Sequence, residues 1–205
     1  MIATSSDEPT AAQLARAAER QELVLHYQPI VAVGSGALIG AEALLRWAHP
    51  ALGLLAPEHF LPIAESAGLM PRIGDWVLRE ACRQMHDWQA AVPESFRLAV
   101  NVAASQVGPD FAIGLRQMLD DTQLPGERLE IELTETAAFG DPALFALFDA
   151  LRAVGVRFAA DDFGTGYSCL QHLKCCPITT LKIDQSFVAG LADDARDRTI
   201  VRTVI

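Results

Sequence analysis

The chain has 205 residues, of which 51% are apolar and 20% are charged, a balance typical of globular proteins. Its formal net charge of −10 argues against binding along a nucleic-acid backbone, which requires a basic surface. No apolar run reaches the length of about 18 residues that a membrane span needs. The first 22 residues are polar and rich in alanine, unlike a secretory signal.

The cysteines indicate a reducing compartment. None of them forms a C-x-x-C pair, and two are direct neighbours, which is poor geometry for a structural disulfide. We therefore expect reduced cysteines in a cytoplasmic protein. The four are Cys82, Cys169, Cys175 and Cys176.

The N-terminal part is predicted to begin with a leader or linker over residues 1–21. Within it, residues 10–21 have the composition of a short helix, with Thr10 as its cap. Two alternating apolar segments, 23–31 and 37–47, are predicted to be strands. Because a short link containing glycine joins them, we expect a hairpin.

Beyond residue 50 the predicted elements alternate between helix and strand with short links. This order predicts a parallel sheet with crossover helices, either an open doubly wound sheet or a closed barrel. No glycine-rich phosphate fingerprint follows the first strand, which disfavours the open dinucleotide-binding fold. The predicted helices cover residues 57–68, 71–91, 109–122, 141–155, 167–174 and 194–205, and the predicted strands cover 96–103, 128–135, 156–161 and 179–184.

Polar residues recur at the same end of the predicted strands, the end that carries the chemistry in a (β/α) barrel. Each one alone has an ordinary structural explanation, such as a solvated edge, a helix cap or an Asx turn. Several carboxylates that meet at one barrel mouth, however, repel one another and need cations. Oxygen ligands of this kind suit Mg²⁺ or Mn²⁺ better than zinc. The polar residues that recur at these strand ends are Glu42, Asn101, Glu132, Asp161 and Lys182.

Two adjacent aspartates, Asp161 and Asp162, precede a Gly-Thr-Gly sequence. Successive strand residues normally face opposite ways, but at a frayed strand end both can turn toward one place. Gly164 and Gly166 would let the following loop bend over a ligand. Adjacent carboxylates could then hold two metal ions, an arrangement suited to hydrolysis of a phosphodiester.

Seven ordered blocks make the chain resemble the EAL domain family, bacterial phosphodiesterases that act on cyclic di-GMP. The resemblance runs from about residue 22 to the last residue. One block alone would be weak, whereas seven in order are specific. The blocks are YQPIV (27–31), EALLRWAHPALGLLAPEHFLPIAESAGL (42–69), GDWVLREAC (74–82), NVAASQ (101–106), ELTET (132–136), DDFGTGYSCL (161–170) and LKIDQSFV (181–188).

The resemblance implies an α/β fold, a modified TIM (β/α)₈ barrel whose first strand is antiparallel to the second. This agrees with the predicted hairpin. A complete barrel needs about 250 residues, and this sequence stops in the helix after the sixth barrel strand. We therefore expect residues 22–205 to be an EAL domain whose C-terminal strands are missing.

The resemblance also implies the site. Lys182 and Glu42 would be catalytic, and Lys182 would contact either the water nucleophile or a metal-bound oxygen. Gln28, Leu44 and Arg46 would bind substrate, and Glu135 would anchor the loop 163–170, which leads to a homodimer interface. The implied ligands of two divalent cations, Mg²⁺ or Mn²⁺, are Glu42, Asn101, Glu132, Asp161 and Asp162.

The implied activity is hydrolysis of cyclic di-GMP to linear pGpG, which lowers this second messenger in bacterial signalling. Family members often carry sensory or GGDEF domains upstream, so such partners are expected here. One alternative is a module that binds cyclic di-GMP without turnover. Another, which uses the residues alone, is a metal-dependent barrel enzyme that acts on an enolate.

Overall fold

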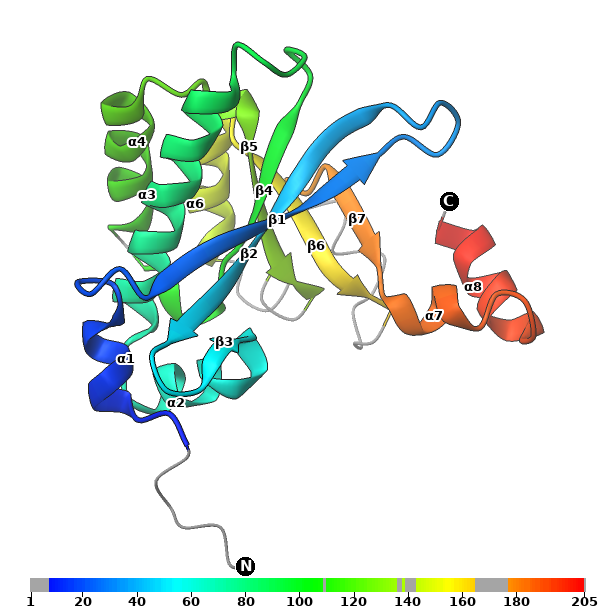
Figure 1. The fold of residues 1–205 in the computed structure, drawn as a ribbon. Helices are drawn as coiled ribbons and strands as arrows, with labels where there is room; N and C mark the ends of the chain where they lie inside the picture. Colours follow the sequence, from blue (N-terminus) through cyan, green and yellow to red (C-terminus); the bar gives the residue numbers. More distant parts are fainter. Residues whose placement is uncertain (1–7, 109, 136–137, 139–142, 165–176, 205) are drawn as a thin grey trace, which may run out of the picture.

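A computed structural model describes residues 8–108, 110–135, 138, 143–164 and 177–204. Its centre is a seven-stranded sheet with the path β1-β2-β4-β5-β6-β7, and β3 pairs with β2 off this path (Figure 1). The strands are β1 (Leu23–Val31), β2 (Leu38–His49), β3 (Gly53–Leu55), β4 (Arg97–Asn101), β5 (Leu129–Thr134), β6 (Arg157–Phe163) and β7 (Thr180–Ile183).

The directions of the strands match the expected TIM-like barrel. β1 is antiparallel to β2, so the predicted hairpin is confirmed. The pairs β2–β4, β4–β5, β5–β6 and β6–β7 are all parallel. Among the described residues β7 pairs only with β6, so this part of the sheet is an open path and not a closed ring.

Helices cover one face of the parallel strands, and α3, α4 and α6 stand along that side in Figure 1. β5 shows the reason: Leu129, Ile131 and Leu133 point into the core, whereas Glu130 and Glu132 lie on the other face. The helices are α1 (Ala11–Ala17), α2 (Leu61–Ser66), α3 (Met70–Trp88), α4 (Phe111–Thr122), α6 (Ala143–Arg152), α7 (Gln185–Ala189) and α8 (Ala195–Val204), with 3₁₀ turns η1 (Pro57–His59), η2 (Ala104–Gln106) and η3 (Gly126–Arg128).

Most predicted elements are confirmed, but the single helix predicted over 57–68 is wrong. It is divided into η1 and α2, because Phe60 between them has φ −136° and is fully buried. Tertiary packing of this ring, against Trp47 among others, overrides the helical pattern. β3 and α7 are not predicted from the sequence. The helix predicted over 167–174 lies outside the described residues.

Within the described residues, no helix has both the length and the apolar character needed to cross a membrane.

Candidate functional site

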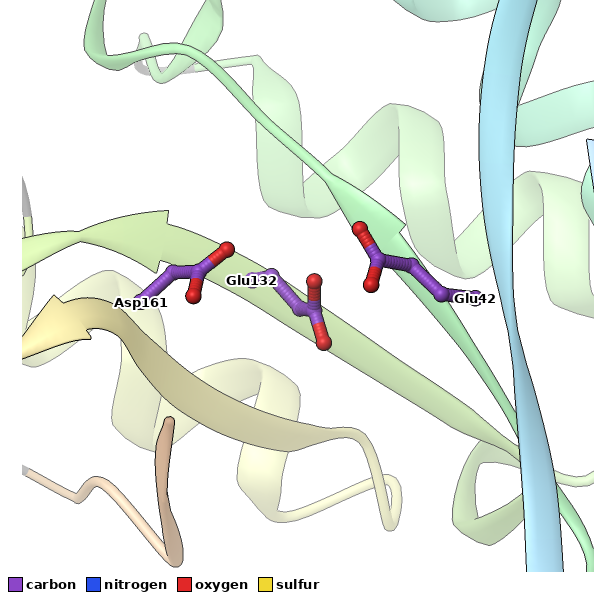
Figure 2. Close-up of side chains that lie close together, drawn as sticks. All are labelled: Glu42, Glu132 and Asp161. Atoms are coloured by element: carbon purple, nitrogen blue, oxygen red, sulfur yellow. The ribbon is translucent and has the colours of Figure 1, made fainter. Parts of the chain in front are cut away.

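The barrel-facing side of the sheet brings three carboxylates together from three strands. Glu42 of β2, Glu132 of β5 and Asp161 of β6 each offer an oxygen, and these oxygens lie within 4.8 Å of one another (Figure 2). The sequence placed these residues at one mouth, and the structure brings all three to one point.

The register of the sheet explains how distant residues meet. Glu42 is level with Ala99, whereas Asn101, two residues further along β4, is level with Glu132. Asp161 is level with Thr134, two residues beyond Glu132. Side chains two residues apart share a face, so this stagger, typical of barrels, aligns the carboxylates obliquely across the strands.

Glu132 is the most deeply placed member, with 1% of its surface exposed. Its Oε1 is buried and has no hydrogen-bond partner among the described residues. A buried carboxylate oxygen without a partner is costly. Burial raises the pKa of Glu132 to about 7, against the opposing effect of Lys182. This oxygen is therefore suited to a ligand that supplies positive charge.

Lys182 of β7 lies among the three carboxylates. Its Nζ is 2.5 Å from Glu132 Oε2, 2.9 Å from Asp161 Oδ2 and 3.2 Å from Glu42 Oε2. Burial alone would lower the pKa of Lys182, but its carboxylate partners outweigh burial and raise that pKa above its ordinary value. The lysine is therefore charged at neutral pH and offsets part of the local negative charge.

Asn101 lies at the end of β4 beside the same cluster. Its Nδ2 donates a hydrogen bond to Glu42 Oε1 at 2.7 Å. Since the amide nitrogen is used in this way, the amide oxygen is the atom of Asn101 that could bind a cation. Three carboxylates and one amide oxygen form a set of hard ligands, which fits Mg²⁺ or Mn²⁺.

An irregularity in the pairing of β6 with β7 determines how the two adjacent aspartates are placed. Ala160 is level with Leu181 and Phe163 with Ile183, so Asp161 and Asp162 together oppose the single residue between those partners. Such a bulge redirects side chains and is common beside active sites. Asp162 also has φ +54°, in the left-handed region that Asp tolerates better than most residues.

Asp162 is not part of the cluster of three carboxylates. Its pKa is raised, first by desolvation and then by the charges of Asp161 and Asp184. Sequence reasoning assigned no role to Asp184, although it lies two residues from Lys182. The side chain of Asp184 caps α7. It accepts hydrogen bonds from the Ser186 hydroxyl and from Ser186 N, and these lower the pKa of Asp184. Whether Asp162 binds a metal stays a prediction.

The residues expected to bind substrate lie beside the cluster on β1 and β2. Gln28 is level with Glu42 and lines a hollow of about 290 Å³ that also contains Glu42 and Lys182. Leu44 lines an adjoining, mostly apolar cavity of about 340 Å³. Arg46 lies further along β2, and its Nη1 donates to Leu45 O at 2.7 Å. Their contacts with substrate stay predictions.

Glu135, at the end of β5, is 3% exposed. Its Oε2 accepts a hydrogen bond from Gly164 N at 2.9 Å. Gly164 follows the two aspartates, and its φ of +102° favours glycine. Glu135 therefore contacts the start of the segment that it was expected to anchor, and residues 165–170 lie outside the described part of the chain.

Comparison with known proteins gives consistent matches. The model of the EAL domain matches residues 11–205. The chain is 45% identical over 194 residues to MucR, a bifunctional diguanylate cyclase/cyclic di-GMP phosphodiesterase of Pseudomonas aeruginosa. It is 40% identical over 195 residues to NbdA, a cyclic di-GMP phosphodiesterase of the same organism. The matches include 94% of this chain but only 28% of MucR and 25% of NbdA.

Solved structures agree. The phosphodiesterase of MucR in complex with cyclic di-GMP superposes with a TM-score of 0.88 at 45% identity, covering 93% of this chain and 78% of that one. The ordered blocks, the antiparallel first strand and the acidic cluster are explained together by this relationship. The chain belongs to the EAL domain family.

Proposed function

We propose that this chain is a metal-dependent phosphodiesterase that opens cyclic di-GMP to linear pGpG. The observation that carries the proposal is the convergence of Glu42, Glu132 and Asp161 around the unpartnered Oε1 of Glu132. Support also comes from the EAL family match and from relatives named as cyclic di-GMP phosphodiesterases.

Two divalent cations, Mg²⁺ or Mn²⁺, would be held by the cluster. When bound, such ions acidify a water molecule and neutralise charge that develops on a phosphate. The protein's part is to hold the ligands in place before the ions arrive. The strands β2, β4, β5 and β6 would do this through their backbone hydrogen bonds. The proposed ligands are Glu42, Asn101, Glu132, Asp161 and Asp162.

Lys182 would have two tasks. Its charge holds the carboxylates together through three short contacts. The same charged group would steady the attacking water, because hydrogen bonds from such a charged donor are strong. Arg46 would hold phosphate, while Gln28 and Leu44 would line the nucleotide position.

Product analysis tests the proposal directly. Purified protein with Mn²⁺ and cyclic di-GMP should release pGpG, resolved by chromatography. Glu132→Gln should reduce the rate by at least about 100-fold, because it removes a ligand charge at the centre of the cluster. Glu94→Gln, at an exposed position outside the cluster, is the matched control and should behave like the parent protein.

Two results would contradict the proposal. If the parent protein binds cyclic di-GMP in calorimetry but releases no pGpG, the chain is a binding module without turnover. If Glu132→Gln hydrolyses cyclic di-GMP as fast as the parent, the cluster is not the catalytic centre. The homodimer through the region 163–170, the upstream sensory or GGDEF domains and the cytoplasmic location stay predictions.

A further inference from the structure

Two hydrogen bonds between Ala103 and Gln106 hold the segment that follows Asn101. Gln106 N donates to Ala103 O at 2.9 Å, and Gln106 Oε1 accepts from Ala103 N at 2.6 Å. Val102, between Asn101 and this pair, is buried and donates from its N to Glu132 O at 2.9 Å. The backbone just beyond Asn101 is therefore tied to both β5 and the side chain of Gln106.

Gln106 in turn rests on Gly74 of α3. A Cβ at position 74 would lie 1.3 Å from Gln106 Nε2 and 2.5 Å from its Cδ. Gly74 is buried inside a 19-residue helix, and its φ is not positive. A glycine there is unfavourable for the helix itself. The structure supplies its packing reason, since any side chain at this position would require the amide of Gln106 to move away.

These contacts form a continuous connection from the helical layer to the acidic cluster. It runs from Gly74 through Gln106 and Ala103 to Asn101, whose Nδ2 donates to Glu42 Oε1. Gly74, Gln106 and Asn101 also line the same cavity of about 340 Å³. Two sequence blocks that carry no proposed ligand besides Asn101, 74–82 and 101–106, thus meet at one contact.

We propose that Gln106 is a positioning residue that sets the orientation of Asn101 toward the metal-binding cluster. The missing side chain at Gly74 leaves the space that the amide of Gln106 occupies. The inference rests on the proposed function. Residues that orient a metal ligand typically change metal affinity or activity about 10- to 100-fold when they are altered. Gln106 is expected to act through Asn101 and not through the stability of the domain.

A double-mutant cycle with Asn101 separates these two possibilities. Gln106→Ala should reduce kcat and the affinity for Mn²⁺, measured by calorimetry without substrate, by about 10-fold each. Gln106→Glu, which keeps an acceptor oxygen for Ala103 N, should retain most of both. In an Asn101→Ala background, Gln106→Ala should change neither value further. Full, additive losses in that background would overturn the proposal.

A second double-mutant cycle tests the packing of Gln106 against Gly74. Gly74→Ala should reproduce the loss seen in Gln106→Ala, because the end of the flexible side chain must rotate away from Ala103. The double variant should be no worse than Gln106→Ala alone, since the new methyl group then fills the vacated space. Gly114→Ala in α4, where a Cβ meets nothing within 4 Å, is the matched control and should be neutral. If Gly74→Ala causes a full loss that is additive with the loss from Gln106→Ala, then Gly74 does not act through its packing against Gln106.

The outcomes also separate this inference from the proposed function. If Asn101→Ala itself leaves Mn²⁺ affinity and pGpG release unchanged, then Asn101 is not a ligand, and that part of the proposed function fails. If Asn101→Ala loses both while Gln106→Ala loses neither, only the positioning role of Gln106 fails.

Discussion

β5 supplies Glu132 to the acidic cluster and β7 supplies Lys182, the cation that contacts it, but the two strands are held in different ways. In β5, the core-facing residues Leu129, Ile131 and Leu133 are at most 1% exposed. In β7, every residue is partly exposed. β7 pairs only with β6 among the described residues, and it leads to α7 and α8, which lie away from the main helical layer (Figure 1).

This difference indicates that the carboxylates and the lysine are held in place by different interactions. The carboxylates are fixed by strands whose opposite face is packed against helices. The balancing cation, Lys182, comes from a strand with little apolar burial, so its ion pairs contribute more of its placement. Changes at the core-facing residues of β5 or β6 should therefore act first on stability, whereas changes in β7 should act first on the site.

The largest expected effect is on stability in the packed strands. Phe158 of β6 is fully buried, and its ring centroid lies 4.7 Å from that of Phe148. Phe158→Ala should lower the free energy of unfolding by about 3–5 kcal/mol through lost burial and a residual cavity. Leu181→Ala in β7 should cost clearly less, because Leu181 is only partly buried. Urea titration of both variants measures this, and equal losses would contradict the contrast between the strands.

Lys182→Met should mainly affect the site. Loss of the charge should reduce kcat by about 100-fold or more. It should also lower the melting temperature of the metal-free protein, because Glu42, Glu132 and Asp161 lose their common partner. Added Mn²⁺ should then raise the melting temperature more than in the parent protein. A variant whose metal-free melting temperature equals that of the parent would show that the ion pairs do not hold the cluster together.

The pH dependence should follow Glu132, the buried carboxyl group of β5. Mn²⁺ must displace the proton that this carboxyl holds, and the pKa of Glu132 is raised to about 7 by burial. The apparent affinity for Mn²⁺ should therefore fall by about tenfold for each pH unit below 7. Calorimetry between pH 5.5 and 8 (a window chosen about that pKa) measures it, and an affinity independent of pH would contradict the assignment.

The same raised pKa predicts the stability of the metal-free protein. Because the folded state holds the proton more tightly than the unfolded state, the stabilisation from this proton is complete below the ordinary pKa of 4.5. It is lost as the pH rises from about 4.5 through about 7. Glu132→Gln cannot titrate at this position, so its unfolding free energy should lack this decline. Parallel slopes for parent and variant would show that Glu132 is not the group responsible.

The smallest expected effects concern two helix caps, one on α1, which packs against the core, and one on α7, which follows β7. Thr10 caps α1 through a capping box with Gln13, and α1 packs Leu14 and Ala17 into the core. Thr10→Ala should cost about 1 kcal/mol of global stability. Asp184 caps α7, whose residues are not buried, so Asp184→Ala should increase only local hydrogen exchange in α7. A global loss from Asp184→Ala would show that α7 is packed as firmly as α1.

The sequence already indicated most elements, the hairpin and the residues of the cluster. Alternation of period two predicted β1 over its full range, and the recurrence of polar residues at strand ends predicted Glu42, Glu132, Asp161 and Lys182 as neighbours. The helix over 57–68 was predicted as a single element, because the deep burial of Phe60 that divides it leaves no local signal.

What the sequence determined by itself is the local pattern: which residues lie on the core face, which lie on the barrel face, and which polar groups end each strand. Tertiary structure alone decided the stagger between strands, the bulge at Asp161 and Asp162, and the seating of Gln106 on Gly74. The physical reason is range. Periodicity is fixed by neighbours along the chain, whereas register and close packing depend on residues that are distant in sequence and meet only in the folded protein.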